Sequence, residues 1–428
     1  MEKKYLSYFK LYLITVLAFA IYWLYCKHSV GNDSTISEWI INYQGGFVRR
    51  GLPGELAFQI AQFLEIKLRT VILFFQIGLY SLYIFLIYKF FQKIKFNGVI
   101  LFAIFTPIFI IYHIAELEVL VRKEIFLFLG FLWFYNISKR ENHYNLTLLW
   151  IIFILPIISI LYEPSIFYYT FFAATLALKI RNFGLIKISL IIFFTFLPSL
   201  ATSWISATAG IITTEGYQLM RDSLLNNFGE ACYRSCEVMN SLRDPSRHLQ
   251  QTFDKLYEGK NTVYIYLFRY LMILIIGFAP LLIMLRYSSL KIKFLKFKKL
   301  IWPFIIVNIT VPAHWLLFID WGRAVNITYV SSILFFFYLY KNDYISINFS
   351  KIKTIIDKFL SFLIRIIFLK SKKGLATFIF IIYAFGWSPP TLLSADINSF
   401  PGYRIPYKTI KFLSLNHLGY NIFYFYKN

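Results

Sequence analysis

Long apolar segments recur along almost the whole chain, with short polar loops between them. A helix needs about 20 apolar residues to cross the roughly 30 Å hydrocarbon core of a bilayer, and several of these segments are somewhat shorter. In lipid, helices satisfy every backbone polar group internally, which favours them for runs of this length. The sequence therefore predicts an all-α fold, a polytopic transmembrane helix bundle of about 11 spans. We place the spans at 11–26, 70–90, 98–113, 124–138, 145–162, 165–180, 186–208, 263–285, 301–318, 324–340 and 374–388.

Composition supports this fold class. The chain is 58% hydrophobic and contains 48 Phe and 32 Tyr in 428 residues, too much apolar surface for a water-exposed protein. The net charge of +23 does not indicate a nucleic-acid partner, because the basic residues fall mostly in short loops between apolar runs. The first run has no small-residue cleavage site, so we expect a retained helix.

The distribution of charge predicts the topology. With the amino terminus in the cytoplasm, six segments lie inside and hold 21 Lys, 4 Arg and 4 acidic residues: 1–10, 89–97, 139–144, 179–187, 286–300 and 341–373. Lysine on one side is an ordinary orientation signal. The rest of the chain holds 8 Lys, 11 Arg and 17 acidic residues, a mixture that this signal does not explain. We therefore expect the outer face to be the working face.

We predict a single integral-membrane domain over residues 1–428. Its outer segments include a first periplasmic segment at 27–69 and a large periplasmic loop at 209–262, which we expect to form a helical lid. Residues 345–370 alternate lysines with apolar residues, as in an amphipathic helix on the inner leaflet, although an extra span fits too. In the first case the tail, 389–428, is periplasmic.

Cys232 and Cys236 lie in the large outer loop, where an oxidising compartment permits a disulfide. Two free thiols fit the spacing about as well. Zinc does not fit, because no CxxC motif or His pair stands nearby.

The stretch 42–56, Asn-Tyr-Gln-Gly-Gly-Phe-Val-Arg-Arg-Gly-Leu-Pro-Gly-Glu-Leu, carries the strongest local signal. Its glycines permit tight turns and close approach to the backbone. Arg49 and Arg50 offer rigid donors that match phosphate oxygens, and Pro53 suits the first turn of a helix, whose N-terminus favours anions. The stretch predicts an anion site; the alternative is a loop whose arginines only meet lipid headgroups.

Three further outer positions are candidate site residues. Glu163 sits at a tight corner between two spans, and Asp320 and Arg323 flank a glycine just before another span. Ionisable groups at membrane depth are costly and usually face a partner or a water-filled cavity. For Asp320 and Arg323 an i,i+3 ion pair at a helix end is an equal alternative. His314 suits a buried structural histidine better than a base.

Glu116, Glu118 and Glu124 stand beside Arg122 and Lys123. We expect local structural pairs among these five residues, with a site role for Arg122 as the lesser alternative.

These clusters suit a ligand that is anionic at one end and polyhydroxylated at the other. Several arginines can hold a pyrophosphate without a metal, and a carboxylate or histidine can deprotonate an attacking hydroxyl. No DxD-like pair, GxSxG, Walker loop or HExxH is present, so we expect no metal and no cofactor.

The Gly45–Leu52 stretch, GGFVRRGL, and Asp320-Trp-Gly-Arg323 look like segments of multispanning proteins from surface-polysaccharide clusters. With about eleven spans and a large late outer loop, the chain resembles the O-antigen polymerases (Wzy-type) of Gram-negative bacteria. These are often described with two large periplasmic loops carrying arginines, whereas the first arginine patch here lies in a short segment.

The resemblance implies a metal-independent glycosyltransferase in the bacterial inner membrane. A growing glycan would leave undecaprenyl pyrophosphate at the periplasmic face and join a new lipid-linked repeat unit. Arg49, Arg50, Arg323 and, more weakly, Arg122 would hold the pyrophosphates. Glu163, Asp320 or His314 would be the catalytic base. The implied partners are the lipid-linked oligosaccharide substrate, membrane lipids, and a chain-length regulator and flippase of the same pathway.

Two alternatives stay open. A GT-C-type glycosyltransferase uses a polyprenyl-phosphate sugar and an acidic residue in its first outer loop, where Asp33, Glu38 and Glu55 are available. A lipid-linked oligosaccharide flippase would line a central cavity with charges, but the span centres are almost purely apolar.

Overall fold

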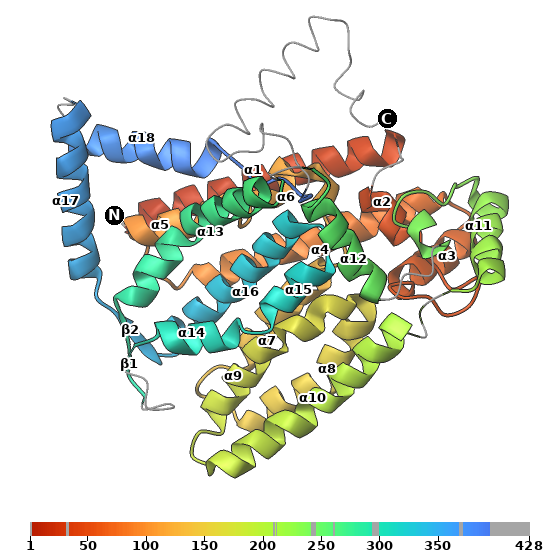
Figure 1. The fold of residues 1–428 in the computed structure, drawn as a ribbon, viewed down its shortest axis with the longest axis horizontal. Coiled ribbons are helices and arrows are strands. Elements are labelled where there is room, and N and C mark those ends of the chain that lie inside the picture. The colour runs from red at the N-terminus through yellow and green to blue at the C-terminus, as the bar shows by residue number, and fades with distance from the viewer. Residues whose placement is uncertain are drawn as a thin grey trace, which may run out of the picture.

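The chain was analysed as a computed structural model, which describes residues 2–30, 34–208, 210, 212–240, 245–259, 262–292, 299–367 and 371–393. The described part is almost entirely helical (Figure 1). Beyond residue 393, the tail predicted to be periplasmic lies outside the described residues.

The elements are listed here in chain order. The α-helices are α1 Glu2–Val30, α2 Ser34–Trp39, α3 Leu52–Phe63, α4 Leu68–Phe91, α5 Gly98–Ile104, α6 Tyr112–Ala115, α7 Ile125–Ile137, α8 Tyr144–Leu161, α9 Tyr169–Lys179, α10 Leu185–Thr208, α11 Thr214–Phe228, α12 Pro245–Leu256, α13 Thr262–Arg286, α14 Ile301–Val307, α15 Val311–Leu317, α16 Trp321–Lys341, α17 Phe349–Ile367 and α18 Lys372–Phe385. The 3₁₀ helices are η1 Leu117–Val119, η2 Glu163–Tyr168 and η3 Glu237–Asn240, and the strands are β1 Ser288–Leu290 and β2 Ile345–Ile347.

Six helices of the described chain are long and apolar enough to cross a membrane. They are α1, α4, α8, α10, α13 and α16. This confirms the prediction of a helical membrane protein.

Helix α16 is surrounded by the rest of the bundle, and every residue of its most apolar 18-residue window is buried. Its polar side chains tie it to neighbouring segments. Tyr329 donates to the carbonyl of Ala103 at 2.6 Å, and Tyr338 donates to the carbonyl of Ser138 at 2.7 Å. Because a buried hydroxyl is costly without a partner, these bonds fix α16 in one position.

Helix α10 shows how small residues pack spans together. Ser199, Ser203 and Ser206 are buried, whereas Phe193 and Phe194 are more than half exposed. Helix α10 packs along α8. Small residues let helix backbones approach closely in lipid, where the hydrophobic effect cannot drive helices together. The small face of α10 therefore turns inward and its aromatic face outward.

Two predicted spans are interrupted. The span expected at 98–113 is helical over α5 and again only from Tyr112, where α6 begins, and the one expected at 301–318 is split into α14 and α15. Pro107 lies in the first break, and Pro312 lies in the first turn of α15, just after the second break. Proline cannot donate a helix hydrogen bond, so it is tolerated in the first turn of a helix but not in the middle of one continuous span.

The break between α14 and α15 is satisfied by neighbouring side chains. Thr170 donates to the carbonyl of Val307 at 2.5 Å, and Thr310 donates to the carbonyl of Phe167 at 2.5 Å. Irregular backbone is tolerated at membrane depth only where protein or water satisfies it. The break between α14 and α15 is therefore stabilised by specific hydrogen bonds from neighbouring threonines.

The predicted inner segments lie together, and we call this side the lysine-rich end. Strands β1 and β2 pair antiparallel there, with Ser289 opposite Ser346. The backbone N–H of Arg140 donates to the side chain of Asn342 at 2.7 Å. Helix α17 runs across the direction of α1 and α16 at this end, as expected for a helix lying on a membrane surface (Figure 1).

The opposite, arginine-rich end carries α2, α3, α11 and α12 (Figure 1). The large outer segment, 209–262, is helical in its described parts, through α11, η3 and α12.

This arrangement predicts that the two ends lie on opposite sides of the membrane. In sealed vesicles, Leu219→Cys on α11 and Lys353→Cys on α17 should react with an impermeant maleimide from opposite sides. Both positions are exposed, whereas Cys26 is buried and Cys232 and Cys236 form a disulfide, so the unsubstituted chain gives the background. Labelling of both variants from one side would contradict the topology.

Candidate functional site

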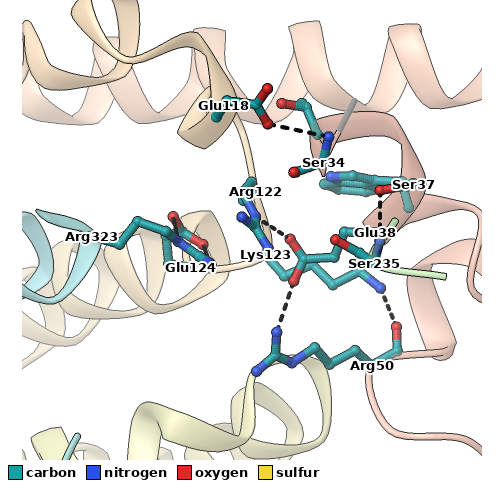
Figure 2. A network of polar contacts seen from close by, with 12 residues as sticks. Ser34, Ser37, Glu38, Arg50, Glu118, Arg122, Lys123, Glu124, Ser235 and Arg323 are labelled. Carbon is teal, nitrogen blue, oxygen red and sulfur yellow. Dashed lines mark hydrogen bonds and ion pairs between the residues drawn. The ribbon is translucent and has the colours of Figure 1, made fainter. Parts of the chain in front are cut away.

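A buried carboxylate organises the arginine-rich end. Glu38, on α2, is 1% exposed and accepts from Arg122 Nε at 2.7 Å and from Arg50 Nη1 at 3.0 Å (Figure 2). Burial alone would raise the pKa of Glu38, but the charges of Arg122 and Arg50 outweigh it and hold the pKa well below its usual range. Glu38 is therefore ionised at neutral pH and keeps two cations in place.

Arg50 joins Glu38 to the corner at Glu163. Its Nε and Nη2 each lie 2.7 Å from one oxygen of Glu163, the two-pronged geometry that suits guanidinium and carboxylate. Burial would raise the pKa of Glu163, but Arg50 lowers it below its ordinary value. The sequence predicted separate roles for these two side chains, and the structure joins them.

The backbone of Arg50 is held in an uncommon conformation. Its φ is +61°, in the left-handed region that L side chains rarely adopt. The ammonium of Lys123 donates to the backbone carbonyl of Arg50 (Figure 2). The guanidinium of Arg50 lies 5.4 Å from the centre of the Tyr162 ring. Lys123 thus fixes the backbone that aims Arg50 at its carboxylates.

Arg323, at the start of α16, completes the network. Its Nη2 and Nε lie 2.6 and 3.2 Å from the two oxygens of Glu124, and its Nη1 lies 2.8 Å from Asp320. Arg122 Nη1 lies 3.8 Å from the same Asp320 oxygen. The i,i+3 pair of Asp320 and Arg323, one of the two alternatives that the sequence left open, is present, and it belongs to a larger assembly.

The sequence analysis expected the acids and bases of residues 116–124 to pair with one another, and this expectation was wrong. Glu124 pairs with Arg323, and Arg122 pairs with Glu38. Glu118 pairs with Arg234 of the large outer segment at 3.2 Å. Residues 122–124 lie in a turn just before α7, so neighbouring side chains point to different partners.

Positive and negative groups balance in this cluster, which we call the ion network. Four cations face four carboxylates: Arg50, Arg122, Lys123 and Arg323 against Glu38, Glu124, Glu163 and Asp320. Asp320 has the most exposed side chain of the four carboxylates, at 22%, against 10% or less for the others. It is the acid best placed to meet a ligand.

Arg49 lies at the edge of the ion network, beside an apolar cavity. The cavity has a volume of about 200 Å³ and is lined by Arg49, Glu163, Pro164, Ile166, Phe167, Leu200, Ser203, Trp204, Ala207, Leu317 and Phe318. Trp204 is 67% exposed and Leu200 40% exposed, on the outward face of α10. The cavity therefore brings charged groups and an apolar surface together.

His314 borders this region from α15. Its ring is 3% exposed, stacks on Phe167, and its Nδ1 lies 2.9 Å from the hydroxyl of Tyr168. These contacts match the sequence-based expectation of a buried structural histidine.

The glycine-rich stretch approaches its own chain closely. The N–H of Arg49 donates to the carbonyl of Gly210 at 3.1 Å. A Cβ on Gly45 would lie 1.7 Å from the carbonyl oxygen of Gly216, so only glycine fits there. Glycine thus lets the large outer segment seat against the loop that carries Arg49 and Arg50.

Polar contacts hold this outer segment over the first one. Arg69 pairs with Glu230 at 2.5 Å, and the N–H of Ser235 donates to Ser37 at 3.2 Å (Figure 2). Cys232 and Cys236, which flank Ser235 in the sequence, form a disulfide.

Sequence reasoning found six members of this region, Arg49, Arg50, Arg122, Glu163, Asp320 and Arg323, and the structure brings them together with His314 beside them. It gave Glu38 only an alternative role and treated Lys123 and Glu124 as local partners. The signal for Glu38 was its place before the glycine-rich stretch. Among the described residues, no three His, Cys, Asp or Glu side chains are grouped to hold a metal ion.

No protein-family model, curated protein or solved structure matches the chain.

Removing one partner of Glu38 should be costly. In Arg122→Ala, Glu38 keeps only Arg50, and uncompensated buried charge typically costs about 3–5 kcal/mol. We expect a large fall in the thermal midpoint of the detergent-solubilised protein. Arg221→Ala is the matched control, because its pair with Asp222 is about half exposed and such pairs contribute about 0–1 kcal/mol. Equal midpoints for both variants would contradict a structural role for the network.

Lys123 predicts a pH dependence of stability. It is fully buried, and burial, only partly offset by Glu38, lowers its pKa to about 7. The unfolded chain, with a lysine pKa of about 10.4, binds more protons between pH 7 and 10, so this group makes stability rise with pH by up to about 1.4 kcal/mol per unit. Lys123→Met should lose that rise in thermal unfolding from pH 7 to 10, whereas Lys351→Met, on exposed α17, should keep it. An unchanged slope in Lys123→Met would show that Lys123 is charged throughout.

Proposed function

We propose that this protein polymerises lipid-linked oligosaccharide repeat units at the outer face of a bacterial inner membrane. One observation carries the proposal: the ion network lies beside an apolar cavity that meets the outward face of α10. A substrate with a phosphate head and a polyprenyl tail has the same two halves. The resemblance to O-antigen polymerases supplies the reaction, transfer of a glycan from undecaprenyl pyrophosphate to a new repeat unit.

The roles of the residues follow from their positions. Arg49 lines the cavity and holds a phosphate at its mouth, while the tail lies along Leu200 and Trp204. Arg50 neutralises Glu163, so the carboxylate does not repel the incoming phosphate. The remaining arginines, Arg122 and Arg323, stabilise the charge of the departing pyrophosphate through a network already in place.

Asp320 is the proposed general base. Its side chain is the most exposed carboxylate of the ion network, and its contacts with Arg323 and, at 3.8 Å, with Arg122 both run through Oδ2. Glu163 is held at both oxygens by Arg50, and His314 is buried against Tyr168 and Phe167. A base must reach the hydroxyl that it deprotonates, which favours Asp320.

The same proposal includes the finer topology. Eleven crossings result if the short helices α5, α7, α9, the α14–α15 pair and α18 complete the six long spans. The segment 209–262 then covers the site as a lid: Glu230 pairs with Arg69 of the first outer segment, and Arg234 pairs with Glu118, just before residues 122–124.

A GT-C-type glycosyltransferase is the second candidate, and Glu38 favours it. This acid belongs to the first outer segment and stands at the centre of the ion network. Enzymes of that type use an acidic residue in this part of the chain, with a polyprenyl-phosphate sugar as donor.

The banding pattern of surface lipopolysaccharide tests both functions. A host lacking this chain should lose the ladder and keep core plus one repeat unit, and Asp320→Asn should not restore the ladder, because a general base contributes about 10²–10⁴-fold to rate. Asp343→Asn is the matched control, an exposed carboxylate at the lysine-rich end, and should restore it fully.

The outcomes separate the candidates. Loss of the single-repeat band as well would favour the GT-C reading, and an unchanged ladder in the deletion host would overturn both. Full restoration by Asp320→Asn, at normal membrane levels, would remove Asp320 as the base.

A further inference from the structure

The lysine-rich end contains the larger cavity, about 510 Å³, which lies among the ends of α4, α7 and α16. Its size falls within the roughly 300–1,000 Å³ of small-molecule sites. It is lined by Leu86, Lys89, Phe90, Gln92, Lys93, Leu132, Tyr135, Asn136, Lys139, Glu141, Tyr338, Lys341 and Asn342.

Four lysines and one glutamate line this cavity, which leaves a net charge of +3. Among the described residues, none of the four ammonium groups is within ion-pair distance of a carboxylate. The charges of Lys93 and Lys139 repel that of Lys341. This is the reverse of the ion network at the other end, where the cations face an equal number of carboxylates. An anion in the cavity would relieve the repulsion.

A second observation points to a ligand. Tyr135 lines the cavity, is 2% exposed, and its hydroxyl has no hydrogen-bond partner among the described residues. Burying a hydroxyl without a hydrogen-bond partner is unfavourable. A ligand oxygen that accepts from Tyr135 would satisfy it.

The lining also has an apolar side, formed by Leu86, Phe90 and Leu132. Lys341 donates to the carbonyl of Phe90 at 2.7 Å, which places an ammonium beside this apolar surface. Lysines against an apolar wall suit a charged group attached to a hydrocarbon part.

We propose that this cavity binds a phosphate group, held by Lys93, Lys139 and Lys341 with a hydrogen bond from Tyr135. The phosphate comes either from the headgroup of a membrane phospholipid or from solution. The proposal does not depend on the reaction at the arginine-rich end.

The test uses the purified full chain in a zwitterionic detergent at low salt, with two probes: short-chain phosphatidylglycerol and inorganic phosphate. Binding is measured by titration calorimetry. Lys93→Gln/Lys139→Gln should bind at least tenfold more weakly, and Lys351→Gln/Lys353→Gln on α17, with the same loss of charge outside the cavity, should bind within twofold of the parent.

A second variant, Tyr135→Phe, should fold normally, because it removes only a hydroxyl that has no hydrogen-bond partner among the described residues. It should weaken binding severalfold without lowering the thermal midpoint. Binding of the lipid alone assigns the site to a headgroup, and competition by inorganic phosphate assigns it to a free phosphate. Equal binding by the cavity and α17 variants, or no binding of either probe, would overturn the proposal.

Discussion

The arginine-rich end depends on one requirement: a charge taken out of water needs its partners in place. Glu38 is almost fully buried, and desolvation of such a carboxylate is compensated only by close cations. Arg50 and Arg122 supply them, and each in turn contacts a further acid, Glu163 or Asp320. No member can be removed alone without leaving a buried charge behind. The positions of α2, the glycine-rich loop, residues 122–124, η2 and the start of α16 are therefore linked through electrostatics.

A second constraint acts on the backbone around α16. This helix is buried along its length, so the segments around it must leave room and still satisfy their own polar groups. In the interrupted stretches, side chains of neighbouring helices satisfy the free backbone carbonyls. The amide of Asn326 donates to the carbonyls of Ile108 and Phe109, in the turn after α5. Broken helices thus stand next to the central helix, where protein replaces the water that their carbonyls would otherwise need.

The sequence predicted those features that depend on residue type within a short stretch. Apolar runs located the six long helices, lysine counts separated the two ends, and the arginine and acid clusters marked six of the residues in and beside the ion network. It did not predict partners. Spacing along the chain favoured Arg122 with its neighbouring acids, but folding brought Glu38 to Arg122 and Arg323 to Glu124. Such pairings depend on how distant helices dock. Pro107 and Pro312 indicated the two interrupted helices, but both stretches are so apolar that the sequence analysis placed a continuous span over each.

The central place of α16 has a consequence for biogenesis. The chain is synthesised from its amino terminus, so Glu38, Arg50 and Arg122 are made long before Asp320 and Arg323. Until then the early helices enclose an unfilled position, and Glu124 lacks the cation that pairs with it. Insertion of α16 fills the position and supplies the missing charges in one step. The late helix therefore acts as the closing piece of assembly, and a nascent chain that stops before residue 321 has neither a filled bundle nor the cation that pairs with Glu124.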